Sequence, residues 1–159
     1  MKRLYLVTIT LAFVACGGNK AGLVSDDLIP ARIADVIDYG TDGVAIVLRG
    51  KDAPSLSIVI GHCEARALMV AMENEDFPRP LSYDLLEEML DKINGKVTRL
   101  VVHSFKDRTY YANLYVETPN GEWVLDCRPS DGMVLVTRLG APIYLEPQLF
   151  ERETANPQA

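Results

Sequence analysis

The segment from Asp126 to Asp131 constrains the fold most, because it marks a place where a strand must give way to a helix. It reads Asp126-Cys127-Arg128-Pro129-Ser130-Asp131. Proline suits the first turn of a helix, since its missing N–H would have no intrahelical partner there, and a neighbouring serine or aspartate can satisfy the free backbone donors. Capping requires neither Arg128 nor Asp126, so these two side chains need another explanation.

Two further helix starts carry polar side chains. The one at residues 79–84 again combines arginine, proline and aspartate, ahead of an apolar run with helical spacing. The other, at residues 61–64, follows an apolar strand and brings Glu64 into a first helical turn. All three predicted helices therefore begin with acidic groups, which the positive end of a helix attracts.

The remaining sequence alternates between runs with a period of two and runs with apolar spacings of three and four, which favour strands and helices respectively. We predict strands at residues 31–38, 44–49, 56–60, 97–104, 109–118 and 123–126, and helices at residues 63–72, 82–93 and 129–139. Short turns between the strands favour antiparallel pairing. The predicted fold is α+β: a two-layer, mostly antiparallel sheet with helices on one face, built from two strand-strand-strand-helix halves.

The first residues predict export. Lys2 and Arg3 precede an apolar run at residues 4–14, which is shorter than the roughly 20 residues of a membrane span and typical of a signal peptide. Ala15-Cys16 then matches the end of a lipoprotein signal. We predict a lipoprotein signal peptide at residues 1–15 and lipidation of Cys16; the alternative is an ordinary secretory signal that leaves Cys16 as a free thiol.

Both interpretations export the protein. Lipid on Cys16 would anchor it in the membrane of the bacterial cell envelope, on the periplasmic side or at the cell surface. Small and polar residues predict a flexible tether at 16–28. One domain follows at 29–150, and the polar residues 151–159 predict a disordered tail.

Removal of the signal peptide would make the protein more acidic. The full chain has 16 Lys and Arg against 22 Asp and Glu, and loss of Lys2 and Arg3 leaves 14 against 22, a net charge of −8. Proteins bind nucleic acid non-specifically through Lys and Arg, which release counterions from the phosphates. A nucleic-acid partner would therefore need a local arginine patch or a cation bound at the site.

Four motifs, in order, resemble those of the bifunctional nuclease family. They are Gly61-x-x-Glu64-Ala65, Arg79-Pro80-x-x-x-Asp84-Leu85, Asp126-x-Arg128-Pro129-Ser130-Asp131 and Gly140-Ala141-Pro142-Ile143-Tyr144, and they span most of residues 31–150. The resemblance implies a compact α+β domain, often a homodimer, with nuclease activity on both RNA and DNA in some members.

The chain departs from the family pattern at four positions. Tyr83 replaces a histidine that relatives usually carry, Cys63 and Cys127 stand inside the motifs, and Gly132 stands where alanine usually continues the helix. The loss of the histidine removes a candidate base or metal ligand, so it bears directly on catalysis.

Hydrolysis of a phosphodiester requires an activated water and neutralisation of charge on the phosphoryl oxygens, which carboxylates holding a divalent cation can supply. The candidate catalytic residues are Asp131, Asp126, Glu64 and Asp84. Asp126 and Asp131 are also the candidate ligands for Mg²⁺, Mn²⁺ or Ca²⁺. The candidate substrate-binding residues are Arg128, Arg79 and Ser130, since arginine holds phosphate through paired N–H donors.

A structural interpretation stays open beside the catalytic one. Acids stabilise helix N-termini by about 0.3 to 1 kcal/mol each, and the two arginines can pair with them. The domain would then be a non-catalytic binding or assembly module of the cell envelope. His62 and His103 lack the spacing of metal ligands, and Trp123 with the nearby tyrosines could stack bases or fill a core.

The cysteines also leave two possibilities. If Cys16 carries lipid, Cys63 and Cys127 remain as an even pair in an oxidising compartment. Both lie inside motifs that the family resemblance would bring to one site, so they are candidates for a disulfide. The alternative is two buried thiols that act as small apolar residues.

Overall fold

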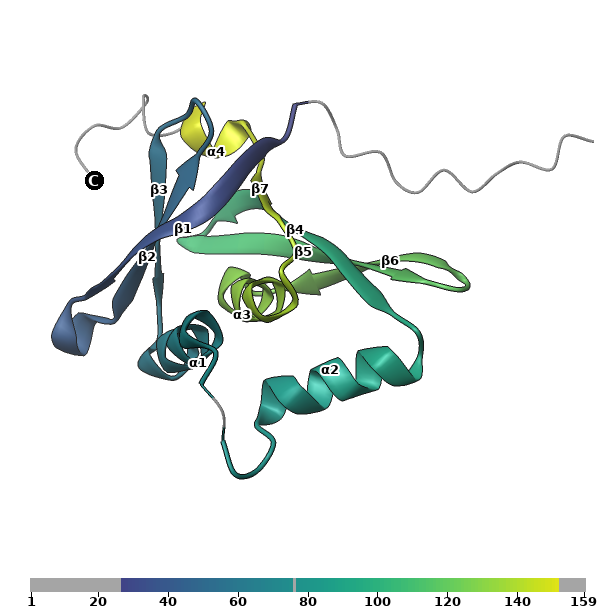
Figure 1. Cartoon of the computed structure of the whole chain (residues 1–159). Coiled ribbons are helices and arrows are strands. Elements are labelled where there is room, and N and C mark those ends of the chain that lie inside the picture. The colour runs from purple at the N-terminus through teal and green to yellow at the C-terminus, as the bar shows by residue number, and fades with distance from the viewer. Residues whose placement is uncertain (1–26, 76, 152–159) are drawn as a thin grey trace, which may run out of the picture.

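The computed structural model describes residues 27–75 and 77–151 (Figure 1). Several sequence predictions concern residues outside these ranges. They are the signal peptide, the lipidation of Cys16, the part of the tether before residue 27 and the tail after residue 151. None of the described helices is both long enough and apolar enough to cross a membrane.

Within the described residues, seven strands form one sheet. The strands are β1 (Ile29–Asp38), β2 (Val44–Gly50), β3 (Ser55–Ile60), β4 (Lys96–Lys106), β5 (Thr109–Thr118), β6 (Gly121–Cys127) and β7 (Ile143–Leu145). The helices are α1 (His62–Glu73), α2 (Ser82–Lys92), α3 (Pro129–Leu139) and the short α4 (Gln148–Glu151), with a 3-10 turn at Gly40–Asp42. The predicted α+β class is confirmed.

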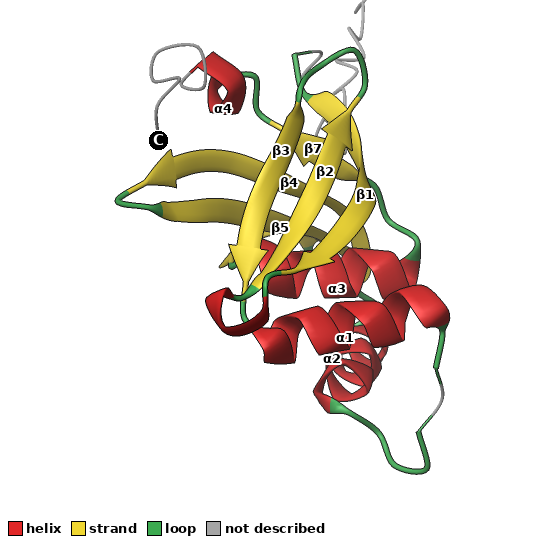
Figure 2. Cartoon of the chain, turned by 90° about the vertical axis from the view of Figure 1, so that its left-hand side faces the viewer, coloured by secondary structure: helices red, strands yellow, loops and turns green. Residues whose placement is uncertain are grey.

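The strand order in the sheet is β3-β2-β1-β7-β4-β5-β6. Every pairing is antiparallel except that of β4 with β7. The sheet is strongly curled (Figure 2), and the short β7, which the sequence analysis did not predict, lies at its centre. The curled sheet and the central β7 do not confirm two flat layers or two equal strand-strand-strand-helix halves.

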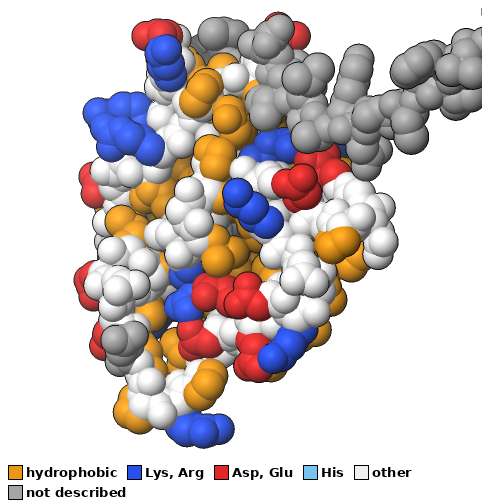
Figure 3. Space-filling view, turned by 45° about the vertical axis from the view of Figure 1, so that its right-hand side comes forward, with side chains coloured by type: hydrophobic (Ala, Val, Ile, Leu, Met, Phe, Trp, Pro, Cys, Tyr) orange, Lys and Arg blue, Asp and Glu red, His pale blue; other side chains and the backbone are white. Residues whose placement is uncertain are grey.

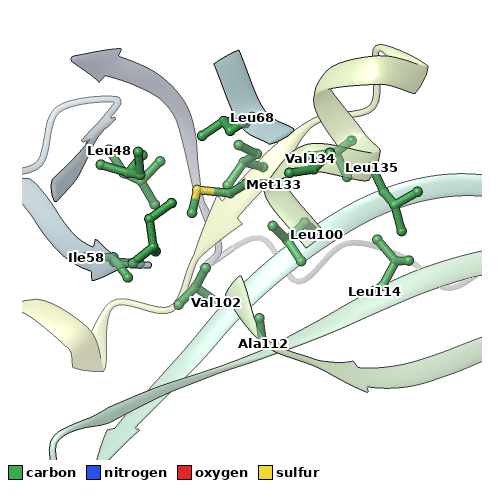
Figure 4. Close-up of a cluster of buried hydrophobic side chains, with 14 of the residues drawn as sticks. Leu48, Ile58, Leu68, Leu100, Val102, Ala112, Leu114, Met133, Val134 and Leu135 are labelled. Atoms are coloured by element: carbon green, nitrogen blue, oxygen red, sulfur yellow. The ribbon is translucent and has the colours of Figure 1, made fainter. Parts of the chain in front are cut away.

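The core lies where α1 and α3 pack against the sheet (Figure 4). Leu48 of β2, Leu68 of α1, Leu100 of β4 and Met133 of α3 are fully buried there. Along β3, buried and exposed residues alternate, as expected for a strand with one face on the core. Apolar burial of this kind is the main favourable term in folding, so α1 and α3 are fixed firmly to the sheet.

Gly132 allows α3 to lie close to β4. A Cβ atom at this position would lie 2.3 Å from Leu100 Cδ1 and 3.2 Å from Cys127 Sγ, and the first of these distances is far below van der Waals contact. Close packing in a core tolerates no such overlap. The departure from the usual alanine therefore has a packing reason, and Cys127 belongs to the same contact.

The helix α2 is the least buried of the three long helices. None of its residues is buried, and Leu85 and Met89 are each 57% exposed. Figure 1 shows α2 lying apart from the sheet, and Figure 2 shows it beside α1 and α3 at one end of the molecule. Its position therefore depends on contacts made by a few of its side chains, among them Tyr83 and Leu90, which pack against the hydrophobic core.

Candidate functional site

The first turns of α1, α2 and α3 meet around one cavity. Its volume is about 520 Å³, and its lining residues are Cys63, Glu64, Ala67, Leu81, Ser82, Tyr83, Leu86, Arg128, Asp131 and Leu135. We call Glu64, Tyr83, Arg128 and Asp131 the polar wall of this cavity; most of the other lining residues are apolar. The three helix starts that the sequence analysis singled out thus supply side chains to the same place.

Arg128 is the centre of the polar wall. It precedes the first residue of α3, and its Nη1 lies 2.8 Å from Glu64 Oε1. Its Nε donates to Asp131 Oδ2 at 2.7 Å and its Nη2 donates to Asp131 Oδ1 at 3.2 Å. The guanidinium is 67% exposed, so a ligand from solvent can reach it. The hydrogen bond to Asp131, followed by its charge, raises the pKa of Arg128 above its usual range.

Tyr83 completes this cluster from α2. Its hydroxyl donates to Asp131 Oδ1 at 2.9 Å. Burial of the ring, followed by the bond to the Asp131 carboxylate, raises the pKa of Tyr83 well above its usual range. The phenol therefore stays protonated at neutral pH and acts as a donor, which is a different role from that of a histidine that gains and loses a proton.

A second arginine cluster lies further along the seam between α2 and α3. Arg138, in the last turn of α3, donates to Asp84 and Glu87 of α2. Asp84 also accepts the backbone N–H of Leu81, which caps the start of α2. Arg138 is only 19% exposed, and its cluster borders a separate cavity of about 310 Å³. These contacts tie α2 to the rest of the domain.

The structure brings only some of the predicted site residues together. Glu64, Arg128 and Asp131 share the first cavity, whereas Asp84 lines the second. Arg79 is exposed in the loop before α2, and Asp126 is exposed at the end of β6; neither lines these two cavities. The predicted substrate-binding residue Ser130 is buried in the first turn of α3.

Sequence reasoning missed three members of these clusters. Tyr83 was described as a departure from the family and not as a site residue, and Arg138 and its partner Glu87 were not considered. A signal for Arg138 exists in the sequence, because it stands seven residues after Asp131, which places both side chains on the same face of a helix.

The polar wall does not fit a divalent cation in this arrangement. Within residues 27–75 and 77–151, no three His, Cys, Asp and Glu side chains are grouped so as to hold a metal ion. Glu64 and Asp131 share the Arg128 guanidinium, and the Tyr83 hydroxyl points at Asp131. Mg²⁺ and Ca²⁺ need several oxygen ligands, whereas here both Asp131 oxygens already accept hydrogen bonds and the positive guanidinium occupies the space between the two carboxylates.

The two cysteines are free thiols in the structure, Cys63 exposed and Cys127 half-buried. Burial, with a further contribution from the charge of Asp126, raises the pKa of Cys127 to about 11. Cys63 lines the candidate site and Cys127 packs beneath α3. The disulfide stays a prediction for the oxidised protein.

Neither of the two histidines and none of the strand aromatics lines this cavity. The rings of His103 and Tyr111 are 6.5 Å apart on β4 and β5. The Arg99 guanidinium lies 3.6 Å from the centre of the Tyr115 ring and pairs with Glu122 at 2.9 Å. These side chains join neighbouring strands, which agrees with a packing role.

Comparison with known proteins now decides the family. The family model for the bifunctional nuclease domain matches residues 46–158, which include all three helix starts of the site. This chain belongs to the bifunctional nuclease family. The family match begins within β2 and continues through α4 and the residues that follow, so the Arg128 cluster lies wholly inside the family domain.

Curated relatives support this assignment. Bifunctional nuclease 1 of Arabidopsis thaliana is 32% identical over 110 residues, which cover 66% of this chain and 34% of the plant protein. Bifunctional nuclease 2 of the same plant is 30% identical over 110 residues, or 66% of this chain and 33% of that protein. An uncharacterised protein of Mycobacterium tuberculosis is 30% identical over 91 residues, or 57% of this chain and 54% of its own length. The chain therefore matches about a third to a half of each relative.

Proposed function

We propose that this member of the bifunctional nuclease family hydrolyses phosphodiester bonds in DNA, RNA or both, and that the cavity between α1, α2 and α3 is its site. The Arg128 cluster carries the proposal: an exposed guanidinium stands between two carboxylates where three helices begin. Helix N-termini attract phosphate, and a guanidinium offers it paired donors.

In this mechanism Arg128 exchanges Glu64 for a phosphoryl oxygen of the substrate and neutralises part of its charge. The released Glu64 carboxylate accepts a proton from the attacking water, a role that contributes on the order of 10² to 10⁴ in rate. The oxygen–phosphorus bond to water forms as the bond to the leaving oxygen breaks; the leaving oxygen takes up a proton from solvent, and Glu64 returns its proton to solvent. Tyr83 holds Asp131 beside the guanidinium throughout.

Metal assistance stays a prediction from the sequence, with Asp126 and Asp131 as the ligands to test. A divalent cation supplies charge neutralisation and an activated water where it binds. The carboxylates of the cavity offer it no free set of oxygens while Arg128 holds them, so no step above depends on it.

The test is cleavage of single- and double-stranded DNA and RNA by residues 17–159. The hydrophobic core cluster lies within residues 29–150, so this chain retains it. Each substrate is assayed with EDTA and with added Mg²⁺, Mn²⁺ or Ca²⁺. We expect Glu64→Gln and Asp131→Asn to lower kcat/KM by about 100-fold.

Glu88→Gln is the matched control, because Glu88 is an exposed acid on α2 that pairs only with Lys92 in the structure. It should cleave like the unaltered protein, and loss of cleavage in Glu64→Gln and Asp131→Asn prepared in the same way then excludes a contaminating nuclease as the source of activity. Equal cleavage by all variants, or no cleavage by the unaltered protein under any condition, contradicts the proposal.

A second candidate function is a non-catalytic binding or assembly module. The apolar residues Leu85 and Met89 of α2 favour it, because both face solvent in the single chain. The homodimer expected from the family would find an apolar surface here. If the protein cleaves nothing and sedimentation shows a dimer that Met89→Glu dissociates, this second function replaces the first.

We also propose that Cys16 carries the lipid that anchors the exported protein to the cell envelope. The signal-like residues 1–15 support this proposal. Mass spectrometry of the protein from the membrane fraction tests it. An unmodified Cys16, or a mature N-terminus beyond residue 16, contradicts it.

A further inference from the structure

A basic depression lies at the end of the molecule where β1 begins and β2 ends. Its volume is about 380 Å³, and its lining residues are Pro30, Ala31, Arg32, Arg49, Gly50 and Lys51. Three of these six are cations and none is an acid, although the whole chain has a net charge of −6. We call Arg32, Arg49 and Lys51 the basic patch.

The sheet register places two of the three cations side by side. Arg32 of β1 and Arg49 of β2 are direct cross-strand partners, and Lys51, in the turn just after β2, lines the same depression. The backbone N–H of Lys51 donates to the Pro30 carbonyl at 2.8 Å, which fixes the turn onto β1. Like charges directly opposite each other destabilise a sheet, so stability does not explain this arrangement.

Other cations make the ion pairs found among the described residues. These pairs involve Arg66, Lys92, Arg99, Arg128 and Arg138. Asp35, further along the same face of β1, accepts the backbone N–H of Val36 at 2.9 Å. The basic patch is therefore available to an anion from outside the domain.

The position of the basic patch indicates which anion. Figure 2 shows the start of β1 and the turn between β2 and β3 at the end of the molecule opposite α1, α2 and α3, which carry the candidate nuclease site. Figure 3 shows Lys and Arg side chains at the upper left of that view, with an acidic side chain beside them. The chain that precedes β1 joins the domain at this same end. The predicted tether of residues 16–28 spans at most about 45 Å when fully extended, so a membrane anchor at Cys16 keeps this end near the membrane.

We propose that the basic patch binds anionic phospholipid headgroups and holds the domain on the membrane with the Arg128 site facing away from it. Near an anionic membrane surface each Lys or Arg strengthens binding by about fivefold, the ratio that corresponds to about 1 kcal/mol. A bound nucleic acid shares the phosphate chemistry. It is the weaker match, because a strand in the Arg128 site would have to cross the whole molecule to reach the patch.

The test is sedimentation of residues 17–159 with vesicles of phosphatidylcholine, with and without phosphatidylglycerol. The patch variant is Arg32→Gln/Arg49→Gln/Lys51→Gln. The matched control is Lys96→Gln/Lys106→Gln/Arg108→Gln, which removes the same charge from exposed positions on and beside β4. We expect the patch variant to bind the anionic vesicles at least about tenfold more weakly than the control, and we expect salt to abolish the difference.

Three outcomes overturn the proposal. They are equal loss of vesicle binding in both variants, no loss in either, and loss of nucleic-acid binding by the patch variant while its vesicle binding is kept. Urea unfolding should show the patch variant to be at least as stable as the unaltered chain, because a like-charge pair is relieved. Its cleavage activity should not change, so failure of this proposal is distinct from failure of the nuclease proposal.

Discussion

The two arginines at the ends of α3 have similar partners and different surroundings. Arg128 contacts Glu64 and Asp131, and Arg138 contacts Asp84 and Glu87, so each guanidinium bridges two carboxylates. Arg128 is 67% exposed at the mouth of a cavity, whereas Arg138 is 19% exposed within the seam between α2 and α3.

The difference separates a site for a ligand from a contact that holds the fold. A solvent-exposed ion pair contributes little to stability, so Arg128 can exchange its partners at low cost. If a largely buried guanidinium separates from its carboxylates, all three charges are left unpaired where little water can solvate them. Its exchange of partners is therefore costly. The ion-pair chemistry is shared, and burial decides which arginine is available to a substrate.

The largest expected effect concerns Arg128. Arg128→Gln should lower kcat/KM for nucleic-acid cleavage by about 100-fold, as expected when a donor to a developing oxyanion is removed. It should change the free energy of unfolding by less than about 1 kcal/mol, because the pair is exposed. Arg66→Gln, which removes another exposed arginine paired with a glutamate, is the control for charge. If Arg128→Gln lowers the free energy of unfolding by more than Arg138→Gln does, the distinction between the two arginines is wrong.

Arg138 should show the reverse pattern. Arg138→Gln leaves Asp84 and Glu87 without their partner, and we expect a loss of about 2 kcal/mol in the free energy of unfolding, reduced from the value for fully buried pairs because these carboxylates are partly exposed. Hydrogen exchange of α2 should increase. Lys92→Gln on the same helix should cost less than about 0.5 kcal/mol. If Arg138→Gln abolishes cleavage in protein that stays folded, Arg138 acts in the site and the distinction fails.

Tyr83 connects α2 to the Arg128 cluster, so it tests the boundary between the Arg128 cluster and the Arg138 cluster. Tyr83→Phe removes one hydrogen bond and should cost about 1 kcal/mol at neutral pH. The folded pKa of Tyr83 lies above its ordinary value of 10.0, so its contribution is fully present below that pH and is lost as the pH rises through the folded value. Urea unfolding across alkaline pH should show a smaller decrease for Tyr83→Phe than for the unaltered chain.

The smallest effect at neutral pH concerns the cysteines, of which Cys63 lines the cavity and Cys127 packs beneath α3. The pKa of Cys127 rises from 9.0 to about 11 on folding, so its contribution to stability is fully present below about pH 9 and is lost between about pH 9 and pH 11. In urea unfolding measured between about pH 9 and pH 11, Cys127→Ala should lose less stability with rising pH than the unaltered chain.

A thiol reagent should modify Cys63 much faster than Cys127 in the folded, reduced chain. Two reactive thiols in the denatured, unreduced protein would exclude the predicted disulfide.

The helix and strand positions could largely be predicted because their signals are local. The predicted helix at 129–139 coincides with α3, since Pro129 suits the first turn and Gly140 ends the helix with a φ of 66°. The predicted strand at 109–118 coincides with β5. By contrast, β7 escaped prediction because three residues between Pro142 and Glu146 carry no periodicity, and only pairing with β1 and β4 makes them a strand.

The candidate site could be predicted in part. Glu64, Arg128 and Asp131 were found because acids and arginine at a helix start have a recognisable pattern. Arg79 was expected to share the site with Arg128, but Arg138 is the second arginine that pairs with helix-start acids in the structure. Sequence proximity favoured Arg79 as a partner of Asp84, whereas helix packing placed Arg138 there.

The sequence by itself determined the longer helices and strands, the family motifs and the three acidic helix starts, because each depends on residues within a few positions of one another. Only the tertiary structure decided which carboxylates each arginine holds, that the Tyr83 hydroxyl reaches Asp131 across 48 positions in the chain, and that Arg32 stands opposite Arg49. These contacts depend on strand register and on the way in which distant helices pack. Burial then sets the strength of each charge interaction, and burial is a property of the assembled fold.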